Sequence, residues 1–273
     1  MKPIKKIAVI HDVCSVGKAA LTNIIPILSV MGIEVCPILT YLLSTHTGGY
    51  GKPVMCPFPD FMRDCADHYK REDISFDAVL IGYLGTEKAI ESAVYFMDQL
   101  RVGKVILDPI FGDNGRLYSN FKEDYVKKLK RLISFSDVIL PNYTEGCYLI
   151  RERGEKIEKE WEELREGLLK LGAKNIVVTS IPGKQRENIQ IGYGNEKISK
   201  RKEWKREEKS FHGTGDIFAA VFCGTYLQTE DLEKSVEEAH KFVSYCIKIS
   251  SQYDYEEREG VLLEKCLSYF FDE

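Results

Sequence analysis

The sequence predicts an α/β fold in which a mainly parallel central sheet is covered by helices on both faces. Three observations lead to this fold: short apolar runs alternate with helix-length segments, several runs end in polar residues, and no linker rich in proline, glycine or serine divides the chain. Strands buried on both faces read as near-continuous apolar runs, which is what a parallel sheet between two helical layers requires. We therefore expect residues 1–273 to form a single domain.

The predicted strands are the short apolar runs. Runs such as KIAVI and DAVLI are rich in branched aliphatic residues, which are typical of buried strands. In chain order the predicted strands are Lys6–Ile10, Glu34–Leu39, Asp77–Ile81, Lys104–Leu107, Asp137–Leu140 and Asn175–Thr179, followed by an antiparallel hairpin of Gln190–Gly194 with parts of 196–205.

The predicted helices lie between these strands and after the hairpin. The first one stops at Gly32, a residue typical of helix C-termini. In chain order the predicted helices are Lys18–Met31, Glu87–Arg101, Lys122–Ser134, Glu160–Leu171, Gly215–Leu227 and Leu232–Ser250. Two charged stretches, Glu152–Glu166 and Lys197–Lys209, are expected to be solvated loops and faces. The second stretch has an alternative interpretation as a mobile segment over the site, because it precedes the strongest motif of the chain.

Composition excludes several classes of function. The hydrophobic fraction of 44 % and the charged fraction of 29 % are ordinary for a globular protein, and the net charge of −4 does not favour nucleic-acid binding. No apolar run is long enough for a membrane span. The eight cysteines are scattered without a CxxC pair, so neither a zinc site nor a dithiol redox motif is indicated. We expect a cytoplasmic protein with reduced thiols that acts on small molecules, without a nucleic-acid or membrane partner.

The segment 211–220, FHGTGDIFAA, carries the strongest chemical signal. Two glycines flank Thr214, and a helix of small apolar residues follows. Glycines let backbone N–H groups turn toward one point, and a helix start adds its positive dipole end, so the segment predicts an anion hole. Asp216 would lie in the first helical turn, placed to accept a proton from a substrate hydroxyl during phosphoryl transfer. The alternative is a plain helix cap made by Thr214 or Asp216.

Polar residues follow four of the predicted strands. They are His11-Asp12, Asp108, Asn142 and Thr179. Ligands of parallel sheets bind beyond the carboxyl ends of the strands, so we expect these residues along one rim. For Asp108 the alternative is a turn residue before proline. His11 is expected to be an ordinary surface or core histidine.

Three further segments identify a family. They are HDVCSVGKAALT at 11–22, LSTHTG at 43–48 and GYLGT at 82–86. In order and spacing they resemble the first substrate loop, the S-x-H-T-G substrate segment and the G-Y-L-G turn of pyridoxal/pyridoxamine kinases, the vitamin B6 kinases. GTGD followed by a small-residue helix resembles the signature of the ribokinase-like superfamily to which those kinases belong. The likeness runs from the first strand to about Tyr226 and implies a ribokinase-like three-layer sandwich.

The resemblance implies a role for each motif residue. In the superfamily the aspartate of GTGD is the catalytic base and the glycine-bounded turn is the anion hole. The implied catalytic residues are Asp216, Gly213, Thr214 and Gly215, and the implied substrate-binding residues are Asp12, Ser44, Thr47 and Tyr83. The implied ATP-binding residues are Asp108, Asn142 and Thr179. The implied metal-binding residues are Glu145 and Asp108.

Some of these roles have alternatives. Ser44 and Thr47 are equally well explained by turn chemistry beside two glycines. Asn142 and Glu145 resemble the N-x-x-E motif of the superfamily, in which the glutamate organises Mg²⁺ through water, but their spacing also fits a capping box. Relatives often have lysine or threonine at Thr179 near the nucleotide phosphates. Lys184 is a candidate substitute for that lysine, although its spacing does not support this.

The implied function is ATP-dependent phosphorylation of the 5′-hydroxymethyl group of pyridoxamine, pyridoxal or pyridoxine, with Mg²⁺. Pyridoxal kinases commonly have serine where Asp12 stands, and an acidic residue there could favour a protonated ring or an amine-bearing substrate. One alternative is a hydroxymethylpyrimidine kinase, although the S-x-H-T-G segment favours the pyridoxal side. Another is a non-catalytic vitamer- or nucleotide-binding protein, against which the intact Asp216 and Glu145 argue. The resemblance also implies a homodimer and activation by a monovalent cation such as K⁺, for which no ligand set is identified.

Overall fold

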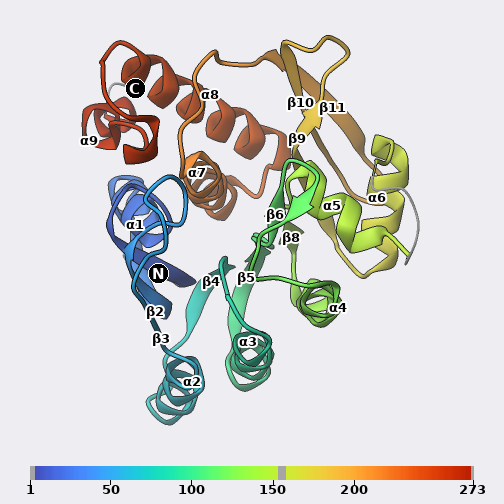
Figure 1. The fold of residues 1–273 in the computed structure, drawn as a ribbon. Coiled ribbons are helices and arrows are strands. Elements are labelled where there is room, and N and C mark those ends of the chain that lie inside the picture. The colour runs from blue at the N-terminus through green and yellow to red at the C-terminus, as the bar shows by residue number, and fades with distance from the viewer. Residues whose placement is uncertain (1–3, 153–157, 272–273) are drawn as a thin grey trace.

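The computed structural model describes residues 4–152 and 158–271. Its main sheet has the strand order β11-β10-β9-β8-β5-β4-β1-β2-β3 (Figure 1). The strands from β2 to β9 along this order pair in parallel, whereas β3, β10 and β11 pair antiparallel with their neighbours. The bounds are β1 Lys5–Val16, β2 Ile33–Thr45, β3 Met55–Pro57, β4 Phe76–Ile81, β5 Val102–Leu107, β8 Val138–Ile139, β9 Asn175–Pro182, β10 Asn188–Gly194 and β11 Ser199–Lys205.

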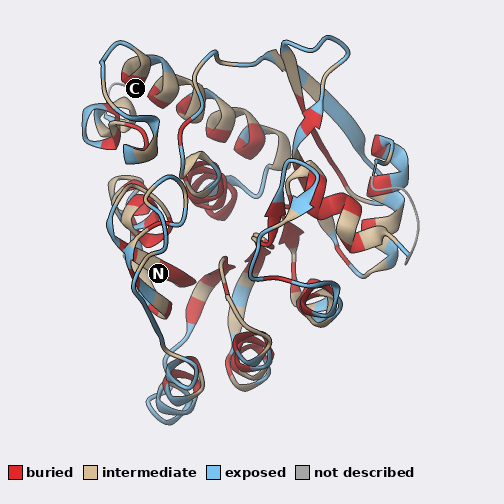
Figure 2. Cartoon of the chain, in the orientation of Figure 1, coloured by how far each residue is buried: buried red, intermediate tan, exposed pale blue. Residues whose placement is uncertain are grey.

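Helices cover both faces of the sheet and enclose two apolar cores. Along β1, Ile7 and Val9 belong to one core whereas Ala8 and Ile10 belong to the other, as the alternation of side chains in a strand requires. The first core is covered by α1 (Leu21–Val30), α7 (Thr214–Thr229), α8 (Leu232–Ser251) and α9 (Leu263–Cys266). The second core is covered by α2 (Phe61–Arg71), α3 (Glu87–Gln99), α4 (Glu123–Leu129), the 3₁₀ helix Lys130–Phe135, α5 (Tyr143–Ile150) and α6 (Trp161–Lys170). Figure 2 shows buried residues on the helix faces that meet the sheet.

The predicted α/β sandwich is confirmed, and every predicted strand and helix is present with shifted bounds. The first two strands are longer than expected, because β1 and β2 continue to pair as far as Val16 and Thr45. The first helix begins at Leu21 and not at Lys18, because the backbone of the preceding loop has positive φ at Gly17 and Ala20. The two-residue strands β6 (Gly112–Asp113) and β7 (Arg116–Leu117) form a separate small hairpin that was not predicted.

The two charged stretches have different structures. Of Glu152–Glu166, residues 153–157 lie outside the described residues, and the remainder leads into α6, which buries Trp161 and Leu164. The expected solvated helix face is therefore present beside a buried one. Most of Lys197–Lys209 forms β11, which is an edge strand and not a loop; its charged side chains discourage pairing with another sheet. No helix in the described parts of the chain is long and apolar enough to cross a membrane.

Candidate active site

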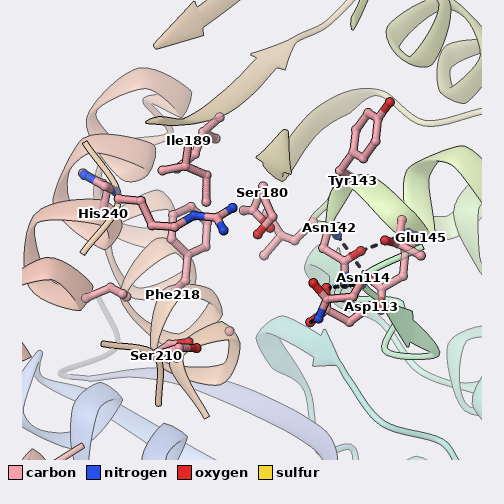
Figure 3. Close-up of a pocket in the computed structure, with 18 of the residues that line it drawn as sticks. Asp113, Asn114, Asn142, Tyr143, Glu145, Ser180, Ile189, Ser210, Phe218 and His240 are labelled. Atoms are coloured by element: carbon pink, nitrogen blue, oxygen red, sulfur yellow. Dashed lines mark hydrogen bonds between the residues drawn. The ribbon is translucent and has the colours of Figure 1, made fainter. Parts of the chain in front are cut away.

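A cavity of about 910 Å³ opens beyond the carboxyl ends of β5, β8 and β9. It runs from the small hairpin β6–β7 and the start of α5 to the wall formed by β10 and α8. In Figure 3, Asp113, Asn142 and Glu145 lie at one end, whereas Ile189, Phe218 and His240 lie at the other. The first turn of α7 also lines the cavity, so three of the four predicted rim positions, Asp108, Asn142 and Thr179, lie in one cavity with the GTGD segment, whereas His11-Asp12 is not part of its lining.

The start of α7 has the geometry of an anion-binding turn. Gly213 is the N-cap residue with φ of 80°, and no side chain caps this helix, so the alternative of a cap by Thr214 or Asp216 does not hold. The first intrahelical bond runs from the N–H of Ile217 to the carbonyl of Gly213 at 3.1 Å, so the N–H groups before it have no helical acceptor. A Cβ on Gly213 would lie 2.0 Å from the carbonyl oxygen of Lys18, whereas a Cβ on Gly215 would meet no atom within 4 Å.

The carboxylate of Asp216 is held by two contacts from the first loop and first strand. Its Oδ2 accepts the backbone N–H of Ala20 at 2.7 Å, and its Oδ1 lies 3.3 Å from Nε2 of His11. Ala20 has φ of 57°, a left-handed conformation that costs a non-glycine residue about 1–3 kcal/mol and is found mainly at functional sites. The strained loop thus directs one N–H group at the candidate base.

His11 is a residue near the site whose role sequence reasoning missed. It is buried between two carboxylates, with Nδ1 2.7 Å from Oδ1 of Asp12 and Nε2 facing Asp216. Burial lowers the pKa of His11, but the hydrogen bonds and charges of these two aspartates outweigh it and raise the pKa to about 10. The only available signal was its position beside Asp12 at the end of the first apolar run. The irregular register between His11 and Val13, which sets how the strand end is oriented, is not readable from sequence.

Glu145 forms a complete capping box with Asn142 at the start of α5. Its Oε2 accepts the N–H of Asn142 at 2.9 Å, while the side chain of Asn142 accepts the N–H of Glu145 at 3.0 Å. Its Oε1 accepts the N–H groups of Phe111 at 3.0 Å and Gly112 at 3.3 Å. The capping-box alternative is therefore confirmed, and the predicted metal role stays a prediction. Burial and the charge of Asp108 raise the pKa of Glu145 well above its ordinary value, although these N–H groups oppose the rise.

Carboxylates concentrate at the polar end of the cavity. Asp108, Asp113, Glu145 and Asp216 all line it, and burial together with the charge of Asp216 raises the pKa of Asp108 to about 8, against the opposing charge of His11. In the described residues no three His, Cys, Asp or Glu side chains form a ready-made metal site. Mg²⁺ is usually bound by one or two carboxylates with waters and substrate phosphates, so this donor set fits a magnesium ion that arrives with a nucleotide.

The other half of the cavity combines an apolar wall with basic residues. Thr179 lines it as predicted, and so does Ser180, which was not predicted. Lys184 does not line it; Lys205, Arg206 and Lys209, from the end of β11 and the segment after it, do. The apolar wall consists of Pro182, Ile189, Ile191, Phe218, Ala219, Val243 and Ile247.

The four predicted substrate residues are not part of this cavity lining. Asp12 is buried beside His11. Burial, together with the charge of Asp12, raises the pKa of Tyr83 to about 12. Ser44 is exposed, and its Oγ accepts the N–H of Val54 at 2.9 Å, a contact between residues ten apart and not within the turn beside the two glycines; the substrate role of Ser44 stays a prediction. Thr47 is exposed. His46, in the same segment, is buried, and its Nε2 lies 2.6 Å from the carbonyl oxygen of Arg258.

Comparisons with known proteins agree with this geometry. A profile of the phosphomethylpyrimidine kinase family matches residues 25–261. A Bacteroides thetaiotaomicron protein described as a phosphomethylpyrimidine kinase is 34 % identical, with a TM-score of 0.92 over 100 % of this chain and 96 % of that one, and another crystal form of it contains pyridoxal. The pyridoxal kinase of Lactobacillus plantarum is 28 % identical, with a TM-score of 0.90 over 98 % of this chain and 96 % of that one.

A relative named for kinase activity on pyrimidines is also similar. The hydroxymethylpyrimidine/phosphomethylpyrimidine kinase of Aquifex aeolicus is 27 % identical over 183 residues, which are 66 % of this chain and 71 % of the relative. The chain therefore belongs to the phosphomethylpyrimidine kinase family of the ribokinase-like superfamily, and it is a phosphotransferase that acts on an alcohol group.

Proposed function

We propose that this kinase transfers the γ-phosphoryl group of ATP to the 5′-hydroxymethyl group of a B6 vitamer. The observation that carries the proposal is the carboxylate of Asp216, fixed in the first turn of α7 at the wall of the rim cavity. The Bacteroides relative with pyridoxal and the Lactobacillus pyridoxal kinase support the vitamer assignment, as does the S-x-H-T-G segment at 44–48.

The cavity is large enough for a nucleotide, and it has an apolar wall suited to adenine as well as a polar end suited to the phosphates. We place the adenine against the apolar wall that includes Ile191, Phe218 and Val243, and the phosphates toward the start of α7. Arg206 and Lys209 also line the cavity, and we expect them to supply the positive charge that Thr179 cannot supply to the phosphates. Mg²⁺, held by Asp108 and through water near Glu145, would neutralise charge on the phosphates.

The chemical step needs a base and an anion hole. Asp216 accepts the hydroxyl proton as the substrate oxygen forms a bond to the γ-phosphorus, and the bond from that phosphorus to the bridging oxygen of ADP breaks. The unpaired N–H groups of Thr214 and Gly215 then stabilise charge on the transferring group. Asp12 and Tyr83 lie near one another on the other side of His11, and we assign them to the ring of the vitamer.

Hydroxymethylpyrimidine is the second candidate substrate. The family profile and the Aquifex relative favour it, and its ring and hydroxymethyl group suit the same base and anion hole. The Bacteroides relative that contains pyridoxal and the Lactobacillus pyridoxal kinase, which each align with nearly the whole chain, support the preference for the B6 vitamer.

Turnover of ATP with purified protein and Mg²⁺ tests the proposal directly. Pyridoxal, pyridoxamine, pyridoxine and hydroxymethylpyrimidine should be compared, with Asp216→Asn as the inactive control. We expect phosphorylation of at least one vitamer, and a loss of roughly 10²- to 10⁴-fold in kcat in the variant with ATP affinity retained. Turnover of hydroxymethylpyrimidine alone would replace the vitamer by the second candidate, and a fully active Asp216→Asn would remove Asp216 as the base.

We also propose that the kinase forms one domain and works as a homodimer, for which an exposed apolar margin provides support. Leu42, Val54, Met55 and Phe61 are exposed near the short edge strand β3. Light scattering on the purified protein should give twice the mass of one chain; a monomeric mass at assay concentration would refute the dimer. Activity in K⁺ compared with Na⁺ tests the expected monovalent cation.

A further inference from the structure

His11 is a buried, charged group that the proposed chemistry does not yet use. Only 3 % of it is exposed, and its two ring nitrogens face two different carboxylates, Asp12 and Asp216. An ionised carboxylate can only accept hydrogen bonds, so a ring that bonds to both must carry a proton on each nitrogen. These two contacts therefore fit an imidazolium between two carboxylates.

One contact competes with this assignment. The backbone N–H of Asp12 also points at Nδ1 of His11, from 3.0 Å, which would suit an unprotonated Nδ1. The carboxylate Oδ1 of Asp12 lies closer to the same nitrogen, at 2.7 Å, a distance typical of a charge-assisted hydrogen bond with a proton between the two atoms. The shorter contact decides in favour of the protonated ring.

The surroundings of the ring favour a cation from every side. Asp12 and, beyond it, the neutral thiol of Cys14 lie on the same strand, Asp216 faces the ring from α7, and Asp108 interacts with it from the end of β5. On the side of β4 the ring packs against the backbone of Gly82, where a Cβ would lie 2.1 Å from Cδ2 of His11. The ring is thus wedged in place, with the carboxylates of Asp12 and Asp216 within 3.3 Å of its two nitrogens, and the raised pKa of His11 agrees with this arrangement.

We propose that His11 is a positioning residue for phosphoryl transfer, whose imidazolium holds the Asp216 carboxylate in orientation and joins it to Asp12. With the N–H of Ala20 on Oδ2 and the ring on Oδ1, the carboxylate of Asp216 cannot turn about its Cβ–Cγ bond without losing a contact. A neighbouring cation also keeps a carboxylate ionised, the state that a base requires. The inference rests on the proposed function, because Asp216 and Asp12 are the proposed base and ring contact.

A pH profile of His11→Gln separates this role from simple packing. We expect kcat at pH 7 to fall on the order of 10- to 100-fold, as for misplaced catalytic groups, with the KM values for ATP and vitamer within a few-fold of wild type. Loss of a cation within hydrogen-bonding distance of Asp216 should also move the acid limb of the kcat profile upward by about 1–3 pH units. Cys14→Ala is the matched control: it disturbs the same strand end but leaves the charge, so its acid limb should stay at the wild-type pH.

A second readout does not depend on activity. In wild-type protein labelled with ¹⁵N-histidine, both ring nitrogens of His11 should be protonated at pH 8, whereas in Asp216→Asn that protonation should be lost at lower pH. A neutral His11 ring at pH 8, or an acid limb unchanged in folded His11→Gln, would overturn the inference. A doubly protonated ring in a protein that phosphorylates none of the tested substrates would instead refute the proposed function.

Discussion

The two glycines of the anion-binding turn should respond to alanine in opposite ways. Gly213 has φ of 80°, and its added Cβ would lie 2.0 Å from the carbonyl oxygen of Lys18 and 2.6 Å from the amide nitrogen of Asn23. The left-handed backbone costs alanine about 1–2 kcal/mol, and relief of the clash by moving neighbouring backbone adds about 1–3 kcal/mol. Gly213→Ala should therefore lower the free energy of unfolding by roughly 2–5 kcal/mol.

Gly215→Ala should leave stability intact or raise it. Gly215 is helical, and its added Cβ would meet no atom within 4 Å, so the substitution gains up to about 1 kcal/mol of helix propensity at no steric cost. The same open space is where we place the transferring phosphoryl group. We therefore expect kcat/KM to fall in a protein that unfolds at the wild-type urea concentration or above.

Urea unfolding and steady-state kinetics on both variants provide the assay. The distinguishing result is the pair: Gly213→Ala is both unstable and inactive, whereas Gly215→Ala is stable and impaired. A Gly215→Ala enzyme with wild-type kcat/KM would show that no reacting group approaches that position. A Gly213→Ala protein as stable as wild type would show that the turn adjusts without a glycine.

Three further predictions address the metal, the capping box and the nucleotide wall. The pKa of Asp108 is raised to about 8, and a metal ligand must be deprotonated, so Mg·ATP should bind more tightly as pH rises from 6 to 9 and should release protons on binding. Calorimetry in buffers of different ionisation enthalpy measures this proton release. Binding of Mg·ATP that does not change with pH would exclude Asp108 as a ligand. Glu145→Gln places an NH₂ group among three backbone donors. The free energy of unfolding, measured in urea, should therefore fall by about 1–3 kcal/mol. Unchanged stability would contradict the role of the capping box. In Val243→Phe the larger side chain extends into the space that we propose for adenine, so the KM for ATP should rise. Vitamer binding, followed by calorimetry, should be unaffected. An unchanged KM for ATP would place the adenine elsewhere.

The fold was predictable from sequence because it depends on local patterns. Apolar runs with polar ends locate strands that are buried on both faces, and the carboxyl-end rule brings Asp108 and Thr179 to the same cavity as the GTGD turn. The helix Phe61–Arg71 was missed because it is strongly polar and buries only Met62, Cys65 and Ala66 along one narrow stripe.

The parts of the site that sequence did not reveal depend on contacts between distant segments. The surroundings of Ser44 depend on its pairing with Val54, whose N–H donates to the hydroxyl oxygen of Ser44. The basic residues at the nucleotide wall include Arg206, close to the end of an edge strand, and not Lys184. His11 becomes a site residue only because α7 carries Asp216 back to the first strand.

The dependence of the first loop on α7 has a consequence for synthesis of the protein. The Ala20–Asp216 bond spans 196 residues, and the side-chain amide of Asn23 bonds to the carbonyls of both Lys18 and Gly213, across 190 residues in the second case. While the chain emerges from the ribosome, β1, β2 and β4 are complete long before the segment that holds Ala20 in its strained conformation. The loop and the base thus come together in one late event. An incomplete nascent chain therefore has no assembled centre in which ATP could be hydrolysed without an acceptor.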